Sequence, residues 1–405
     1  MNLSKTCLAA ALSLSMAATA YAADTIKIGV SGPYTGGSSS MGVSMRAGVR
    51  LAAQDINANG GVLGRQLELI ERDDEAKNER GVQISQELIS RENVVATVGF
   101  INTGVTLAGT RFYQKAEIPV IVNVATGTVV SKQFEPPKYE HNYVFRTAAA
   151  DNIQAPMIAA EAVTKRGLKK VAIMADSTNY GQLGREDMEK ALDKLGVKPV
   201  VIEKFNIGDV DMTAQLLRAK EAGAEALLTY GIGPELAQLA NGMAKLGWKV
   251  PMIGSWTLAM ANFIDTARAN GDGALMPQTF IQNPNTPKRK AFIDAYIKDN
   301  QPKNGVIESA VSAAQGYDSL LLLAAAIEQA GNTKGQDIRA ALESLNKPIE
   351  GVIMTYEQPF SVSDHETIGS PDVVYMGEVS KGRVVFAHPE DEQRSVANSG
   401  QVAQK

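Results

Sequence analysis

The residues best suited to bind a charged group follow an apolar run at residues 94–99. The run predicts a strand that is buried on both faces, and Asn102 or Thr103 is a good N-cap for a helix that resumes at Val105. A helix N-terminus offers unpaired backbone N–H groups and the positive end of the helix dipole, which suit a carboxylate or another anion. A capped helix that binds nothing fits the same residues, so the surroundings of this turn must decide.

Other reactive side chains have simpler explanations. Asp364 and His365 suggest an acid–base pair, but they lie on a predicted loop with no nucleophile nearby. Arg146 is a candidate anion anchor, although its place between the two halves of the chain favours a hinge salt bridge. The three histidines lack metal-ligand spacing, and the glycine-rich turn at residues 231–234 lacks the third glycine of a dinucleotide site. We therefore expect neither a metal site nor a cofactor.

The composition is that of a globular protein with enough apolar material for two cores. The 405 residues carry a net charge of -4, and 44% of them are hydrophobic. Basic and acidic residues are interspersed, so no cluster of Lys and Arg suggests a nucleic-acid partner.

The first 22 residues have the pattern of a signal peptide. Lys5 precedes an apolar run from Leu8 to Ala18, and Ala20 and Ala22 are the small residues that a signal peptidase reads. We expect cleavage after Ala22 and export of a soluble mature chain. The single cysteine lies in this leader, which excludes thiol catalysis, disulfides and thiolate metal sites in the mature protein. We expect no later stretch to be long enough and free enough of charge to span a membrane.

Strands and helices then alternate twice in the same order, which predicts parallel sheets with helices on both faces. The expected strands are at residues 26–30, 66–71, 94–99 and 118–122, and again at 171–175, 200–205, 226–230 and 250–254. The expected helices are at residues 42–57, 79–91 and from 105, and again at 181–195, 211–222 and 234–246.

The repeat predicts an α/β protein with two similar doubly wound parallel-sheet lobes. Two helices after the repeat, at 288–300 and 309–330, have no counterpart and are expected to return to the first lobe. Lobe 1 would comprise residues 23–145 plus 277–355, and lobe 2 residues 146–276 plus 356–405. The chain would cross between the lobes near Arg146, Gln278 and Tyr356, and three crossings form a hinge that permits closure.

Ligands of open α/β sheets bind beyond the carboxyl ends of the strands, so two lobes placed face to face would enclose a cleft. The segments expected at this cleft are residues 34–41, 102–106, 124–126, 177–181, 231–233 and 255–257.

Several motifs together resemble a known family. They are Ile28-Gly29-Val30-Ser31-Gly32-Pro33, then Asp55-Ile56-Asn57 with Gly60-Gly61 and Gly64, and then Asp73-Asp74. In this order behind a leader they resemble the periplasmic binding proteins for branched-chain amino acids and related ligands, from about Ile26 to Phe386. The resemblance implies the type I periplasmic binding fold, no enzymatic activity, and a monomer in the periplasm. It also implies that lobe closure captures a small carboxylate for an ABC transporter permease in the inner membrane.

The resemblance implies roles for particular residues. Thr103 and residues 124–126 match the positions that hold a ligand carboxylate in the family, and Tyr180-Gly181 matches a pair that closes over the ligand. Tyr34 and Met41 flank a Gly/Ser-rich loop and are further candidates. The full set of candidate ligand-binding residues is Asn102, Thr103, Val124, Thr126, Tyr180, Trp256, Tyr34 and Met41.

The position that would bind a ligand ammonium departs from the family. The amino-acid binders have a Glu two residues after the glycine that ends the fourth strand of lobe 2, and here Gly254 is followed by Trp256. An indole has no acceptor with which to neutralise a desolvated ammonium. The substitution predicts a carboxylate with an apolar or aromatic body stacked on Trp256 and no essential amine. An amino-acid receptor that uses another acidic residue, a ligand-sensing module and an exported enzyme are the alternatives.

Overall fold

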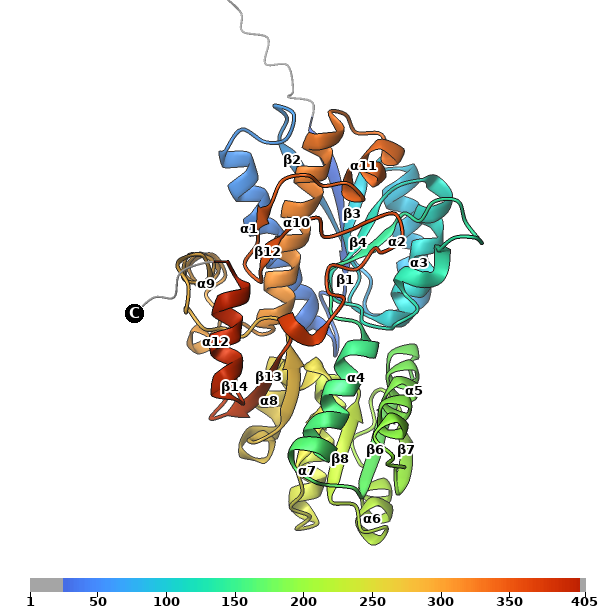
Figure 1. The fold of residues 1–405 in the computed structure, drawn as a ribbon, viewed down its shortest axis with the longest axis vertical. Helices are drawn as coiled ribbons and strands as arrows, with labels where there is room; N and C mark the ends of the chain where they lie inside the picture. Colours follow the sequence, from blue (N-terminus) through green and yellow to red (C-terminus); the bar gives the residue numbers. More distant parts are fainter. Residues whose placement is uncertain (1–24, 401–405) are drawn as a thin grey trace, which may run out of the picture.

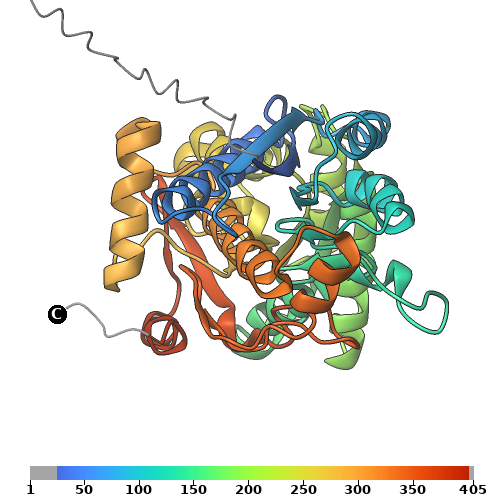
Figure 2. The same ribbon diagram turned by 90° about the horizontal axis from the view of Figure 1, so that it is seen from above.

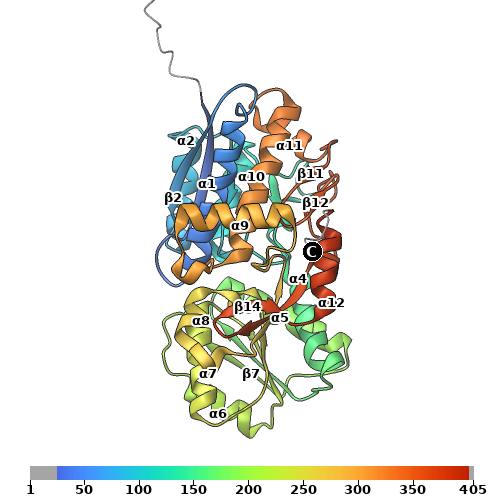
Figure 3. The ribbon, with the colours of Figure 1, turned by 90° about the vertical axis from the view of Figure 1, so that its left-hand side faces the viewer.

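The structure is a computed structural model that describes residues 25–400, and it consists of two α/β lobes placed one above the other (Figure 1). The predicted signal peptide lies outside the described residues. Each lobe is built on its own sheet, and the side view shows lobe 1 above lobe 2, with α9 (Pro287–Asn300) and α8 (Ala261–Ala267) on either side of the boundary between them (Figure 3).

Lobe 1 has a five-stranded parallel sheet in the order β2-β1-β3-β4-β5. Its strands are β1 (Ile26–Gly32), β2 (Leu67–Asp73), β3 (Ala96–Gly99), β4 (Val120–Val122) and β5 (Val144–Arg146). Its helices are α1 (Ser39–Ala58), α2 (Asn78–Ser90), α3 (Thr103–Ala116), α9 (Pro287–Asn300), α10 (Ala310–Ala330) and α11 (Gly335–Leu342). All four residues of β3 are buried, as its apolar sequence predicts.

The return of the later helices to lobe 1 is seen directly. In the view from above, α9 stands at the outer edge of this lobe, on the opposite side from α2 and α3 (Figure 2). Helix α10 packs along α1, where two glycines allow close approach (Figure 1). A Cβ atom on Gly48 would lie 1.9 Å from the carbonyl oxygen of Ala313, and one on Gly316 would lie 2.4 Å from that of Met45. The two backbones are therefore in contact.

Helix α10 corrects one expectation from the sequence. Among the described residues it is the one helix that is long and apolar enough to span a membrane by length and composition. However, 83% of its most apolar window is buried inside the protein, as expected for the core helix of a globular lobe.

Lobe 2 has a seven-stranded sheet in the order β14-β13-β10-β9-β8-β6-β7. The parallel strands are β6 (Val171–Asp176), β7 (Val201–Phe205), β8 (Ala226–Tyr230), β9 (Met252–Gly254) and β10 (Leu275–Gln278). The antiparallel strands are β13 (Tyr375–Ser380) and β14 (Arg383–Phe386). The helices are α4 (Asp151–Ala160), α5 (Asn179–Lys194), α6 (Thr213–Glu221), α7 (Gly233–Lys245), α8 (Ala261–Ala267) and α12 (Pro389–Asn398). Each lobe therefore has its own core of five parallel strands, and lobe 2 adds an antiparallel hairpin, β13–β14, to its sheet.

The chain crosses between the lobes three times. The first crossing joins β5 to α4, and the second follows β10. The third crossing comes later than Tyr356, because the segment that follows Phe360 still pairs with β5 in lobe 1. The N–H of Arg146 donates to the carbonyl of His365 at 2.8 Å, and the N–H of Thr367 donates to the carbonyl of Arg146 at 3.0 Å. An unpaired strand edge accepts such a neighbour readily, and the chain reaches lobe 2 only after Thr367.

Candidate functional site

The turn after β3 has the unusual backbone that a close approach to β1 requires. Gly99 has φ +149°, and Phe100, with φ +66°, is in the left-handed region. A Cβ atom on Gly99 would lie 2.3 Å from the carbonyl oxygen of Ser31. Left-handed backbone at a non-glycine residue is costly and occurs often at binding sites. The turn directs the N-terminus of α3 out of the carboxyl end of β3.

Asn102 and Thr103 are both held at this N-terminus. The side-chain amide of Asn102 donates to the Ser38 hydroxyl at 3.0 Å instead of capping α3. Its Oδ1 atom is buried and has no hydrogen-bond partner among residues 25–400. Thr103 Oγ1 accepts a hydrogen bond from the N–H of Gly127 at 3.3 Å, which joins this turn to the loop after β4.

The loop after β4 presents Thr126 beside Thr103. Its backbone carbonyl accepts from the N–H of Asp151 at 2.8 Å. Its hydroxyl is buried and has no partner within the described part of the chain. Val124, two residues earlier, is also buried. The structure thus brings together the two turns that the sequence places at the carboxylate end of a ligand.

Tyr180 and Trp256 come from separate elements of lobe 2 and are joined through Ser255. The Tyr180 hydroxyl forms a short hydrogen bond with the Ser255 hydroxyl, directly before Trp256. The N–H of Trp256 donates to Gln154 Oε1 at 3.3 Å, and its carbonyl accepts from Gln278 Nε2 at 3.2 Å. Side chains from the first and second crossings therefore fix the backbone of Trp256, which is only 2% exposed. That its ring contacts a ligand stays a prediction.

Asp151 is a residue that sequence reasoning missed. It is the first residue of α4, directly after the first crossing, and it is fully buried. Neither carboxylate oxygen has a hydrogen-bond partner anywhere in residues 25–400. Burial raises the pKa of this carboxyl group to about 7, and the Thr126 hydroxyl, the positive charge of Arg146 and the Tyr230 hydroxyl offset part of that rise. An aspartate at the start of a helix is ordinary in a sequence, so only the tertiary structure distinguishes this one.

Tyr230 completes the group from the end of β8. Its ring packs edge-on against Tyr180 with centroids 5.6 Å apart. Burial raises the pKa of Tyr230, and the neighbouring Asp151 raises it further. Its hydroxyl is also without a partner among the described residues. We call Asn102, Thr126, Asp151 and Tyr230 the cleft cluster.

The two lobes touch around the cleft cluster. The Thr128 hydroxyl of lobe 1 donates to Asp187 of α5 at 2.6 Å. The Asn262 amide of α8 donates to the carbonyl of Gly37 at 2.7 Å. Because all members of the cleft cluster except Asn102 are fully buried, this arrangement corresponds to closed lobes.

Tyr34 and Met41 do not join the group in the way that was expected. The Tyr34 hydroxyl donates to the carbonyl of Val30 at 3.0 Å, and the Arg46 guanidinium lies 4.2 Å from the ring centroid. Met41 is buried in the hydrophobic core on α1. Tyr34 thus uses its polar group inside lobe 1, and Met41 serves packing, so the ligand proposal no longer relies on either residue.

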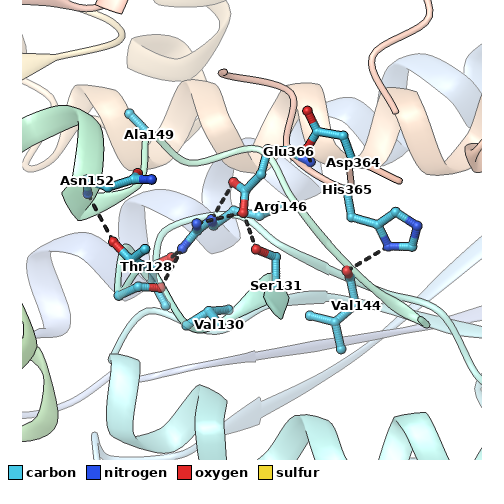
Figure 4. A network of polar contacts seen from close by, with 12 residues as sticks. Thr128, Val130, Ser131, Val144, Arg146, Ala149, Asn152, Asp364, His365 and Glu366 are labelled. Atoms are coloured by element: carbon cyan, nitrogen blue, oxygen red, sulfur yellow. Dashed lines mark hydrogen bonds and ion pairs between the residues drawn. The ribbon is translucent and has the colours of Figure 1, made fainter. Parts of the chain in front are cut away.

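The other singled-out residues are structural. Arg146 forms the expected hinge salt bridge, with Glu366 at 2.7 Å (Figure 4). The ring of His365 stacks on Phe145 at 3.9 Å, and its Nδ1 atom lies 3.0 Å from the carbonyl of Val144. Asp364 accepts a hydrogen bond from the N–H of Glu366 at 3.0 Å. These contacts give Asp364 and His365 structural roles, so the structure offers no reason to assign an acid–base function to them.

A separate cavity of about 230 Å³ lies along the second crossing and is lined by both lobes. Gln282 on its wall is already satisfied, because it donates to the carbonyl of Gly305 at 2.7 Å and accepts from the N–H of Ile307 at 2.9 Å. The cleft cluster holds buried polar atoms that still need partners. The cleft cluster, whose buried polar atoms lack close hydrogen-bond partners among residues 25–400, is therefore the candidate ligand site that we pursue.

Comparison with known proteins gives one family and a consistent fold. Residues 25–383 match the model of a family described as periplasmic binding protein. The chain is 28% identical over 325 residues to the leucine-, isoleucine-, valine-, threonine- and alanine-binding protein of Pseudomonas aeruginosa. The aligned residues make up 80% of this chain and 83% of that protein.

Solved structures share the architecture. A type 1 periplasmic binding protein from Bordetella pertussis Tohama I has a TM-score of 0.79 and 30% identity, covering 90% of this chain and 99% of the other. A solute-binding protein of an ABC transporter from R. palustris, solved in complex with benzoate, has a TM-score of 0.76, covering 90% and 95% of the two chains. Its identity of 20% makes it similar in fold alone.

Proposed function

Because the chain belongs to the periplasmic binding protein family, we propose that it is the periplasmic substrate-binding component of an ABC importer and captures a small carboxylate by lobe closure. It would act as a monomer, without turnover of the ligand, and deliver it to a permease in the inner membrane. The expected signal peptide supports export to the periplasm.

The cleft cluster is the observation that carries this proposal. Leaving a polar group buried without a partner costs about 1–3 kcal/mol, so a site with several such atoms is poorly stabilised when empty. A small polar ligand between the lobes would supply the missing partners. Its contacts to both lobes would shift the population toward the closed form, which the permease would recognise.

The carboxylate end of the ligand is assigned to lobe 1. The Thr126 hydroxyl and the N-terminus of α3 offer donors to an anion, and Thr103 and Asn102 border the same place. A carboxylate accepts hydrogen bonds only, so a hydroxyl and backbone N–H groups are suitable partners.

The body of the ligand is assigned to Tyr180 and Trp256. Trp256 stands where the amino-acid binders of the family have a Glu, which favours an apolar or aromatic acid without an essential amine. The fold itself accommodates such ligands, as the complex of the R. palustris protein with benzoate illustrates.

The alternative is an amino acid, and Asp151 favours it. A buried carboxylate close to Thr126 and Tyr230 is the acceptor that Trp256 cannot provide for an ammonium group. The P. aeruginosa relative, named for binding five amino acids, points the same way. We regard the amino acid as the better supported of the two ligand classes, because Asp151 is a fully buried carboxyl group that lacks a close hydrogen-bond partner among residues 25–400.

Calorimetry with matched pairs of acids tests the proposal and separates the two classes. The pairs are L-leucine with 4-methylpentanoate and L-phenylalanine with 3-phenylpropanoate, which differ only in the amine. Tighter binding of the amine-bearing member in the wild type, lost in Asp151→Asn, supports an amino-acid receptor. Tighter binding of the amine-free member supports the aromatic or apolar acid. If no acid in a wider panel binds, carboxylate capture is wrong.

A further inference from the structure

Arg146 connects the segment that leads into the third crossing to the loop that carries Thr126 (Figure 4). Its side chain is 1% exposed, and its Nε and Nη2 atoms donate to the two carboxylate oxygens of Glu366, each at 2.7 Å. A guanidinium and a carboxylate bound through two parallel hydrogen bonds have a fixed mutual orientation. The contact with Glu366 therefore fixes the direction of the third nitrogen of Arg146, Nη1.

That remaining nitrogen holds the loop after β4. Nη1 of Arg146 donates to the carbonyl of Gly127 at 2.8 Å, next to Thr126. The N–H of Gly127 is bound in turn by Thr103. Both polar groups of this glycine are thus fixed, one by the helix start that would receive the carboxylate and the other by the hinge. The position of the Thr126 hydroxyl depends on both contacts.

Glu366 belongs to the segment that leads into lobe 2. The backbones of His365 and Thr367 pair with Arg146, and the Ser131 hydroxyl forms a short hydrogen bond with Glu366. Eight residues after Thr367 the chain enters β13 of the lobe 2 sheet. The carboxylate that orients Arg146 therefore belongs to the lobe 1 segment that leads into the third crossing, and it is far in sequence from the loop after β4.

We propose that Arg146 and Glu366 are positioning residues for the carboxylate-binding loop, so that the segment leading into the third crossing sets ligand affinity. The inference rests on the proposed function, because it assumes that the ligand contacts Thr126. Groups that orient the residues in direct contact with a ligand commonly control affinity without touching it.

A neighbouring ion pair provides a matched control. Arg339 and Glu343 are nearly buried, lie in lobe 1, and bind each other at 2.6 Å. Glu343 also lies 3.2 Å from His365, so it secures the same segment as Glu366. Within residues 25–400, the hydrogen bonds that join Arg339, Glu343 and His365 do not reach the loop after β4. Its loss should affect stability alone.

The test uses the full chain and two readouts. Hydrogen exchange of the amides at residues 125–128 is measured without ligand in Glu366→Gln, Arg146→Lys, Ser131→Ala and the control Glu343→Gln. A lysine cannot bind Glu366 and the Gly127 carbonyl in the same geometry, and Ser131→Ala is the mildest variant if the others fold poorly. Affinities for L-leucine and 3-phenylpropanoate are measured in parallel, with Thr126→Ala as a reference.

We expect exchange in the loop to accelerate about tenfold in Glu366→Gln and Arg146→Lys, with a smaller change in Ser131→Ala and none in the control. Affinity for whichever of the two acids binds should fall about tenfold in the first two variants. If the loop in Glu366→Gln and Arg146→Lys exchanges no faster than in the control, the inference is wrong. It is also wrong if the loop exchanges faster in these variants but they bind an acid as tightly as the wild type does, while Thr126→Ala weakens the binding of that acid. If Thr126→Ala leaves both affinities unchanged, the proposed function is wrong. The positioning role of Arg146 and Glu366 is then tested only by the rate of hydrogen exchange in the loop.

Discussion

Asp151 is the residue whose environment departs most from what its type prefers. A carboxylate that is buried without partners is costly in its charged form, which is why its pKa rises to about 7. Residues of this kind are commonly kept for binding at the expense of stability. The cost and the function can be measured separately.

The first prediction concerns stability without ligand. The pKa of Asp151 is higher in the folded than in the unfolded state, so the folded state loses stability as the pH rises from about 4 to about 7. Asp151→Asn removes this charge and should raise the free energy of unfolding at pH 8 by roughly 2 kcal/mol relative to the wild type. The gain should disappear below about pH 4. Scanning calorimetry at both pH values measures it, and a less stable variant at pH 8 would contradict the burial argument.

The second prediction concerns the pH dependence of binding. A ligand ammonium requires ionised Asp151, so affinity for an amino acid should weaken up to about tenfold per pH unit as the pH falls below about 7. A ligand without an amine places its own negative charge nearby and should bind the protonated form, so its affinity should weaken as the pH rises above about 7. Titration calorimetry between pH 5 and pH 9 gives the sign. Asp151→Asn is the control, because its profile should be flat in this range.

At the residue level the sequence predicted which turns would meet, and their contact with a ligand stays a prediction. Thr103 and Thr126 follow from their places after predicted strands, because the carboxyl ends of neighbouring parallel strands share one edge of a sheet. Asp151 could not be found in this way, since burial depends on how lobe 2 closes over it. Tyr34 was placed in the correct segment, but its hydroxyl turned inward to Val30, and no sequence pattern specifies that choice.

At the scale of elements, the sequence predicted the helices α1 and α10 but not their contact with each other. The other helices and strands that it did not predict lie mostly near the crossings between the lobes. The sequence predicted none of α4, α8, α12, β5, β10, β13 and β14. The antiparallel strands β13 and β14 come from the end of the chain and do not belong to the repeat. The pairing of α1 with α10 depends on Gly48 and Gly316, whose significance appears only when the two backbones are seen in contact.

The third prediction follows from that contact. Gly48→Ala would place a Cβ atom 1.9 Å from a backbone oxygen of α10, so the helices must separate. We expect a loss of about 1–3 kcal/mol in unfolding free energy, despite the gain in helix propensity. Gly242→Ala in α7 is the control, because its Cβ atom would meet only the tip of the Leu216 side chain. Urea denaturation of both variants measures the difference, and equal effects would argue against backbone contact as the cause.

At the scale of the whole molecule, closure depends on a few contacts between the lobes. The hydrogen bond from Thr128 to Asp187 joins the loop after β4 in lobe 1 to α5 in lobe 2. The family and the two-lobed fold could be inferred from the order of motifs, because that order spans nearly the whole chain. The closed arrangement of the lobes could not be inferred in this way, because the sequence does not show which surface residues of one lobe contact the other.

The fourth prediction concerns this closing contact. Thr128→Val keeps the shape of the side chain and removes the hydroxyl, which donates to Asp187 and accepts from the N–H of Asn152 at 3.0 Å. Losing these contacts with lobe 2 should cost the closed state about 1 kcal/mol. Affinity for a bound acid should fall about fivefold, because ligand binding must then close a more open protein. Small-angle scattering should give a larger radius of gyration for the ligand-free variant, and calorimetry gives the affinity. A variant that is unchanged in both would remove this contact from the closure mechanism.

The placement of the two tryptophans has a practical consequence. Trp256 stands at the junction, whereas Trp248 belongs to the separate hydrophobic core of lobe 2. The chain has no other indole, so a change in emission on adding a solute would arise chiefly from Trp256. With a ligand bound at Trp256 as proposed, the protein would carry its own optical reporter of occupancy, and large solute libraries could be surveyed without attaching a dye.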